Sequence, residues 1–237
     1  LFFVITGFLF WTKVLRADGG LNAGSLYRSR ILRLTPMYLV SVLAVMAVVA
    51  ALSGFSLRTD PMSLLRELRS WLSFGFLYAG DINGVKDAHR INAVYWTLAY
   101  EWMFYLALPF LAVFRRYPAW LALFAAAFFF GTQAPITLNF ISGAAAAMIV
   151  HHRLLPAGLD GRWLTPLPLA ALAAVFLMPS LPPVVHVVLM FVFFLFVAHG
   201  NSLFGLLATG AAKVLGAVSY SIYLLHCIVL FVVVTLV

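Results

Sequence analysis

Residues 95–114 read YWTLAYEWMFYLALPFLAVF, an apolar run that carries a single acidic residue, Glu101. The run is long enough for a helix that crosses a bilayer, which needs roughly 20 residues. A carboxylate inside such a helix is costly, so it is normally buried against a partner and has a function. Thr97, Glu101 and Tyr105 are four residues apart and therefore fall on one face of the helix. The stretch predicts a spanning helix with a buried polar stripe.

The composition of the whole chain points to the same class of protein. Hydrophobic residues make up 65% of the 237 residues, charged residues 9%, and the mean hydropathy is +1.06. A soluble domain is about half apolar and about a quarter charged. We therefore predict an all-α, polytopic membrane helix bundle with about eight spans. The apolar runs that support these spans are 1–12, 34–53, 95–114, 119–133, 136–151, 164–179, 184–199 and 214–237.

The net charge of +8 indicates orientation in a membrane. Placing residues 13–33 in the cytosol leaves most of the 15 Lys and Arg residues on the cytosolic side, as the positive-inside rule expects. The basic residues are divided among short loops, which argues against a nucleic-acid partner. Residues 54–94 form the one extramembrane stretch large enough to shape a site, and within it 71–79 is too short to span. The single cysteine, Cys227, excludes an intrachain disulfide.

Two arginines stand at the predicted cytosolic end of the 34–53 span. Arg30 and Arg33 are three residues apart, so on a helix they share a face. Planar, permanently charged guanidinium groups suit phosphate oxygens, and a phosphate-bearing acyl donor such as acyl-CoA fits there. The same pair also fits a simple anchor on lipid headgroups.

A third polar group lies in the last apolar run. One face of the predicted helix 214–237 carries small or polar residues three or four positions apart: Gly216, Ser219, Tyr223 and His226. Gly216 permits close helix approach. A histidine within a membrane is a candidate base or proton relay. His226 could equally be a packing residue, and Glu101 a structural carboxylate. No histidine pair has metal-ligand spacing with a carboxylate, so no metal site is predicted.

Four short sequence motifs, in this order along the chain, resemble those of a known family. They are LFFVITGFL at 1–9, Arg30-x-x-Arg33, WTLAYE at 96–101 and SYSIYLLH at 219–226. Together they resemble the membrane-bound acyltransferase family 3, whose members O-acylate sugars, exopolysaccharides, lipopolysaccharide, peptidoglycan and some antibiotics. The resemblance covers nearly the whole chain. No single motif is specific for this family, but the occurrence of all four in this order is.

The resemblance implies a function and a set of site residues. The function is transfer of an acyl group, most simply acetyl, from a cytosolic acyl-CoA donor to a hydroxyl of a sugar, exopolysaccharide or glycolipid. No bound cofactor is implied, and the expected location is the bacterial inner membrane. Glu101 and His226 become the candidate catalytic residues, and Arg30 and Arg33 the donor-binding pair. The cavity-lining candidates are Thr97, Tyr105, Ser219 and Tyr223.

Members of the family also have an R-x10-H motif in their first span, and the histidine of this motif is the expected catalytic base. This chain contains no match to that motif. We therefore expect 1–237 to be a single acyltransferase-like domain that is truncated at its N-terminus and also at its C-terminus. Two alternatives remain. One is a non-catalytic partner or transporter in polysaccharide export, with Glu101 and His226 on a proton path. The other is a catalytically inactive relative.

Overall fold

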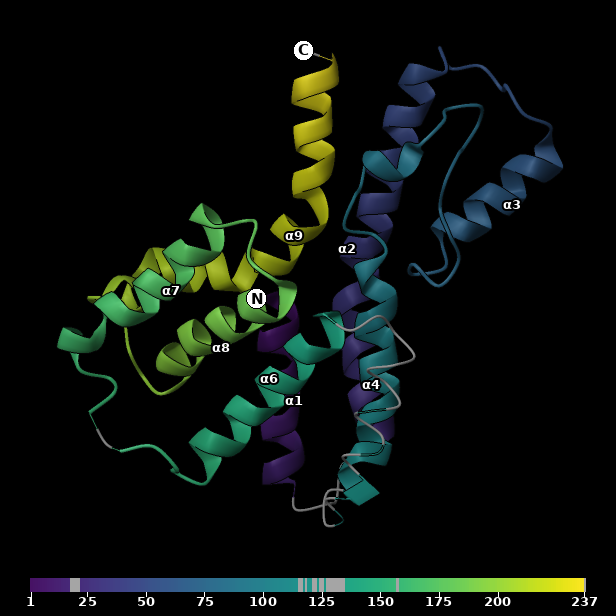
Figure 1. Cartoon of the computed structure of the whole chain (residues 1–237). Helices are drawn as coiled ribbons and strands as arrows, with labels where there is room; N and C mark the ends of the chain where they lie inside the picture. Colours follow the sequence, from purple (N-terminus) through teal and green to yellow (C-terminus); the bar gives the residue numbers. More distant parts are fainter. Residues whose placement is uncertain are drawn as a thin grey trace. The chain divides into compact units, whose positions relative to one another are not determined.

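The computed structural model describes residues 1–17, 22–114, 117, 119, 120, 123, 126, 135–156 and 158–236 (Figure 1). The chain forms two compact units, each assembled from two separate stretches. The first comprises Leu1–Asn22 and Ala107–Lys213, and the second Ala23–Leu106 and Val214–Val237. Helices α4 (Thr97–Phe114) and α9 (Gly210–Leu236) contribute residues to both units. The predicted span 119–133 lies outside the described residues except at four isolated positions.

The first unit is a cluster of apolar helices. Helix α6 lies along α1 and also packs on α8, which in turn packs on α7. Val4, Ala146 and Phe194 form a buried cluster where three of these helices meet. The helices of this unit are α1 (Phe2–Arg16), α6 (Pro135–His151), η2 (Arg162–Leu164), α7 (Pro166–Leu177), α8 (Pro183–Ala198) and η3 (Leu206–Ala208).

Two glycines allow α1 and α6 to approach closely. A Cβ atom at Gly7 would lie 2.4 Å from the carbonyl oxygen of Phe140. A Cβ atom at Gly143 would lie 2.1 Å from the carbonyl oxygen of Val4. Both distances are far below van der Waals contact, so neither position has room for a side chain. Small residues at such crossings are characteristic of helix packing in membranes.

The second unit holds all the candidate site residues. It is formed by α2 (Ala23–Leu52), α3 (Pro61–Trp71), η1 (Ala88–Arg90), the first part of α4, and α9 from Val214 onward. Its core joins side chains from α2, α3, α9 and the segment before α4. Tyr38 of α2 is central to this core: its hydroxyl donates to the Trp71 carbonyl, accepts from the Phe74 amide at 3.0 Å, and lies 2.9 Å from the Tyr95 hydroxyl.

Two expectations from the sequence are corrected here. Residues 13–33, expected to form a loop, are helical up to Arg16 and again from Ala23 onward. Helix α2 is continuous across its arginines because Leu26, Arg30, Leu34 and Tyr38 recur every four residues and are buried along one face. Gly216 is not a point of close approach: within the second unit, no described side chain or neighbouring backbone comes within 4 Å of its Cβ position.

Helix α3 is a further element that was not predicted. Pro61 occupies its first turn, and the Asp60 carboxylate accepts the Ser63 amide at 2.9 Å, which caps the helix. The hydrogen bonds from Ser63 hold the pKa of the Asp60 carboxyl below its usual value. At 11 residues the helix is too short to span a membrane. It belongs to the stretch between α2 and α4, which the sequence predicts to lie outside the membrane.

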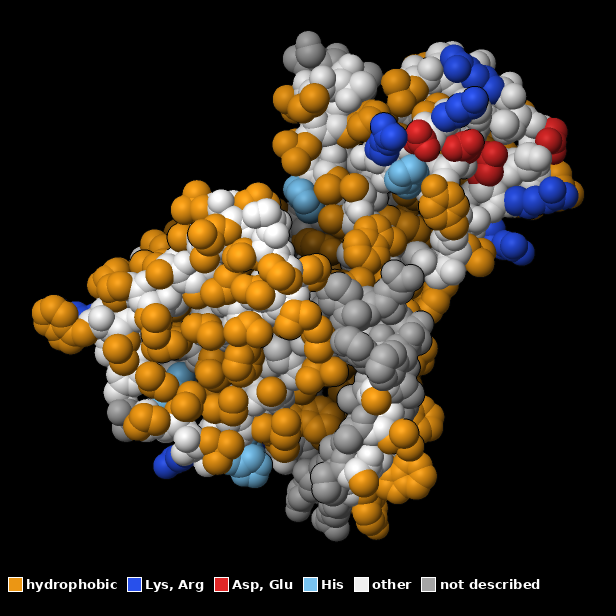
Figure 2. All heavy atoms as spheres, viewed as in Figure 1, with side chains coloured by type: hydrophobic (Ala, Val, Ile, Leu, Met, Phe, Trp, Pro, Cys, Tyr) orange, Lys and Arg blue, Asp and Glu red, His pale blue; other side chains and the backbone are white. Residues whose placement is uncertain are grey.

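The described chain is helical, apart from one isolated bridge between Ile82 and Val85. Among the described residues, two helical stretches, Ala23–Leu52 and Gly210–Thr235, are long and apolar enough to cross a membrane. In Figure 2 acidic and basic side chains gather over α3 and its surroundings, and hydrophobic side chains cover much of the other described surface. The prediction of an all-α membrane helix bundle is confirmed. Four shorter apolar helices accompany the two long stretches: Thr97–Val113, Ile136–His151, Arg162–Leu177 and Pro183–Ala198.

The glycine crossing gives a stability prediction. Gly143→Ala should lower the free energy of unfolding by on the order of 1–3 kcal/mol, because the added methyl group forces α1 away from α6. Gly216→Ala is the matched control: its site is open, and alanine is favoured over glycine in a helix by about 1 kcal/mol. Thermal unfolding of the full-length protein in detergent, followed by tryptophan fluorescence, measures both. Equal melting temperatures for the two variants would contradict the crossing.

Candidate active site

Glu101 is buried on α4 together with the rest of its polar stripe. Its side chain is 3% exposed, Tyr105 is 1% exposed, and Thr97 is also buried. The three residues follow one another at intervals of one helical turn, so the stripe faces the interior of the second unit along its length.

The two oxygens of the Glu101 carboxylate have different surroundings. The Tyr105 hydroxyl, one turn along the same helix, donates a hydrogen bond to Oε1. Oε2 is buried and accepts no hydrogen bond from the described residues. A buried carboxylate oxygen with unused acceptor capacity is costly in a protein interior and calls for an explanation. A ligand hydroxyl that donates to Oε2 would supply the missing bond.

Positive charge comes to this carboxylate from α2. The guanidinium carbon of Arg30 lies 5.9 Å from the centre of the Tyr105 ring, and the Arg30 side chain is buried at 9% exposure. The charges of both Arg30 and Arg33 act on the Glu101 carboxyl. Arg33 itself is exposed. The two arginines therefore differ, although their spacing had suggested one shared role: Arg30 belongs to the buried site, and Arg33 faces outward.

Thr97 connects the Glu101 helix to α9. Its hydroxyl lies 2.6 Å from the Val94 carbonyl and 2.7 Å from the Tyr223 hydroxyl. Because the threonine hydroxyl has one hydrogen, which goes to Val94, the Tyr223 hydroxyl is the donor in the second bond. Two of the candidate cavity-lining residues thus touch each other, across 126 positions of sequence.

Ser219 and His226 have more local contacts. The Ser219 hydroxyl donates to the Gly216 carbonyl of its own helix at 2.8 Å, and Ser219 is exposed. The Nδ1 atom of His226 lies 2.8 Å from the Tyr223 carbonyl, and Nε2 lies 3.3 Å from the Cys227 sulfur. His226 therefore lies one helical turn from Tyr223. Its contacts among the described residues do not include Glu101.

Tyr220 is a residue that the sequence reasoning passed over. Its hydroxyl lies 3.4 Å from the Leu34 carbonyl of α2, and it is close enough to Glu101 and Arg33 to interact electrostatically. The sequence could have identified Tyr220 through its position three residues before Tyr223 in the motif SYSIY. Residues three apart in a helix are neighbours on one face.

Within the described ranges, no group of three His, Cys, Asp or Glu side chains could hold a metal ion. The second unit instead offers a carboxylate oxygen able to accept a proton or hydrogen bond, a hydroxyl that fixes the other oxygen, and an adjacent guanidinium group. Such a set can bind a hydroxyl group and remove its proton as that hydroxyl attacks an electrophile.

Comparison with known proteins assigns the chain to a family. A family model described as an acyltransferase domain, that of acyltransferase family 3, matches residues 1–237. No curated protein and no solved structure matches the chain.

The contact between Thr97 and Tyr223 can be measured by a double-mutant cycle. Thr97→Val and Tyr223→Phe each remove one side of the bond, so their combined effect on stability should fall short of the sum by about 0.6 kcal/mol, a typical value for membrane helices. Unfolding free energies of the single and double variants give this coupling. Pairing Thr97→Val with Tyr220→Phe is the control, with no coupling expected. A coupling of zero in the first cycle would show that the bond does not form.

Proposed function

The chain belongs to acyltransferase family 3, and from that premise we propose that it transfers an acyl group from a cytosolic acyl-CoA-type donor to a hydroxyl of a sugar, exopolysaccharide or glycolipid. Membership supports an acyltransferase role, a membrane-associated location, and the existence of an acyl donor and an acceptor. The acetyl group, the carbohydrate acceptor and a bacterial inner membrane are further parts of the proposal.

The observation that carries this function is the buried Glu101 carboxylate, whose Oε2 accepts no hydrogen bond from the described residues, in a chain that the family model matches over residues 1–237. In the proposed step the acceptor hydroxyl donates to Oε2 of Glu101. The hydroxyl oxygen then attacks the thioester carbonyl carbon, its proton passes to the carboxylate, and the thiolate of the donor leaves. General-base assistance of this kind contributes roughly 10²–10⁴-fold to a rate.

The other residues have supporting roles. Tyr105 holds Oε1 by donating to it, so Oε2 keeps a fixed direction. Thr97 and Tyr223 tie α4 to α9 beside the carboxylate. His226 acts through Tyr223, whose carbonyl lies beside its ring, and Ser219 braces the same helix. We propose these five as lining or positioning residues.

Arg30 and Arg33 are proposed to bind the phosphates of the donor. Arg33 is exposed and able to meet a large anionic molecule, whereas buried Arg30 lies beside the ring of Tyr105, which is bonded to Glu101. A guanidinium group binds phosphate oxygens strongly and stays charged at every physiological pH. The alternative of a non-catalytic export partner does not account for the match to an acyltransferase family.

The role of Glu101 can be tested by an isosteric change. Glu101→Gln keeps the side-chain shape but removes the base, so acyl transfer by the full-length protein should fall by about 10²-fold or more. Asp160→Asn, an exposed carboxylate in the other unit, is the control and should retain wild-type transfer. The assay follows a radiolabelled acetyl group from acetyl-CoA to envelope polysaccharide. Wild-type transfer by Glu101→Gln would exclude Glu101 from the chemistry.

If the two arginines bind the donor, their substitution should change KM and kcat differently. Arg33→Ala should raise the KM for acetyl-CoA by about tenfold, as expected when one charge-assisted hydrogen bond is lost. Arg30→Ala should lower kcat as well, because its charge also acts on Glu101. Arg28→Ala, an exposed arginine on the same helix, should change neither. If all three variants raise KM alike, or none does, the arginines anchor the helix to lipid headgroups.

A further inference from the structure

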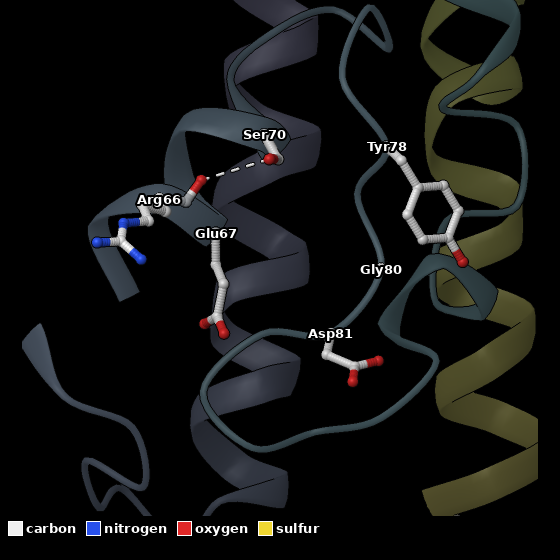
Figure 3. Close-up of a pocket in the computed structure, with 6 residues that line it drawn as sticks. All are labelled: Arg66, Glu67, Ser70, Tyr78, Gly80 and Asp81. Carbon is white, nitrogen blue, oxygen red and sulfur yellow. Dashed lines mark hydrogen bonds between the residues drawn. The ribbon is translucent and has the colours of Figure 1, made fainter. Parts of the chain in front are cut away.

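A pocket of about 390 Å³ opens in the extramembrane stretch between α2 and α4 (Figure 3). Its volume lies at the lower end of the range of about 300–1,000 Å³ that small-molecule sites occupy. Helix α3 forms one side, and the loop that follows it forms the other. The residues that line it are Arg66, Glu67, Ser70, Tyr78, Gly80 and Asp81.

The helix side of the pocket is firmly attached to the core. Trp71, next to the pocket residue Ser70, is completely buried, and Leu64 and Leu68 pack against the same core. The Tyr95 hydroxyl lies 2.8 Å from the Ser70 carbonyl and 2.8 Å from the Trp71 carbonyl. Since Tyr95 lies two residues before the first residue of α4, the wall of the pocket is bonded to the segment that leads into the helix carrying Glu101.

The two carboxylates are held in place without using up their acceptor capacity. The Asn83 amide donates to Oε2 of Glu67 at 2.9 Å, and the Asp87 amide donates to Oδ1 of Asp81 at 2.9 Å. A carboxylate has about four acceptor positions, so each can still accept a hydrogen bond from a ligand. Backbone donors fix the direction of both groups, which is what a binding site needs.

An aromatic ring adjoins these polar groups. Tyr78 is 80% exposed, and its ring carbon lies 2.7 Å from where a Cβ atom of Gly80 would be. The absence of a side chain at Gly80 thus lets the ring lie close against the loop. An exposed aromatic face next to hydrogen-bonding groups offers an apolar surface and polar contacts to one ligand.

The charges select among ligand classes. The lining contains two carboxylates and one guanidinium group, and the Arg66 side chain extends away from Asp81 (Figure 3), so a phosphate or another anion would be repelled. An acyl chain would leave the polar lining without partners. A ligand with many hydroxyl groups meets both demands, because it is uncharged and its hydroxyls can donate hydrogen bonds to Glu67 and Asp81.

We propose that this pocket is a recognition site for an uncharged saccharide segment of the acceptor. The proposal rests on the proposed transferase function and adds to it the place where the acceptor is held outside the membrane. Tyr78 packs against a sugar ring, and Glu67 and Asp81 accept hydrogen bonds from its hydroxyls. The bond from Tyr95 to α3 keeps this site in register with the start of α4.

The test uses the full-length protein in lipid nanodiscs and envelope polysaccharide from cells that lack the gene. Tyr78→Ala and Asp81→Asn should each raise the KM for polysaccharide by about tenfold, the effect of losing one good contact. The KM for acetyl-CoA and its hydrolysis without acceptor should stay unchanged. Phe55→Ala and Asp160→Asn are matched controls: both side chains are exposed and lie outside the pocket lining, and the variants should leave every parameter unchanged.

Binding of fluorescently labelled polysaccharide without donor separates the two proposals. Weaker binding by Tyr78→Ala and Asp81→Asn supports the pocket even if the wild-type protein transfers no acyl group, a result that would count against the transferase function alone. Wild-type affinity and KM in both variants would overturn the pocket and leave the transferase proposal intact. Absence of both binding and transfer by the wild-type protein would overturn both.

Discussion

The hydrogen bond from Tyr105 to the Glu101 carboxylate is the interaction around which the second unit is organised. A carboxylate in an apolar span must be compensated, and one helical turn of α4 supplies the first donor. The charge of Arg30 on α2 supplies a second interaction. Thr97, one turn in the other direction, binds Tyr223 and so brings in α9. Three helices that are far apart in sequence are thereby fixed around one acidic group.

A second set of hydroxyl groups ties the stretch between α2 and α4 to this arrangement. Tyr38 on α2 and Tyr95 before α4 both bond to the Trp71 carbonyl at the end of α3. The rings of Tyr38 and Phe74 stack at 3.9 Å between centroids, which covers these bonds from water. The pocket beside α3 and the Glu101 stripe therefore share a common support.

Local pattern predicted some elements well and others poorly. The helix around Glu101 was expected at 95–114 and runs from Thr97 to Phe114, because its apolar run is long and uninterrupted. Helix α2 begins well before the expected span, since Arg28, Arg30 and Arg33 suggested a loop although the helix continues through them. Helix α3 was missed because few of its 11 residues are apolar, and packing by Leu64, Leu68 and Trp71 helps to stabilise it.

The sequence by itself determined the all-helical membrane class, the family, and the polar stripe of Thr97, Glu101 and Tyr105. These follow from composition, from short words, and from a spacing that any helix imposes. Only the tertiary structure decided that Arg30 is buried while Arg33 is exposed, and that Oε2 of Glu101 accepts no hydrogen bond from the described residues. Burial and hydrogen bonding depend on which helix lies opposite, and periodicity along one chain segment carries no information about that neighbour.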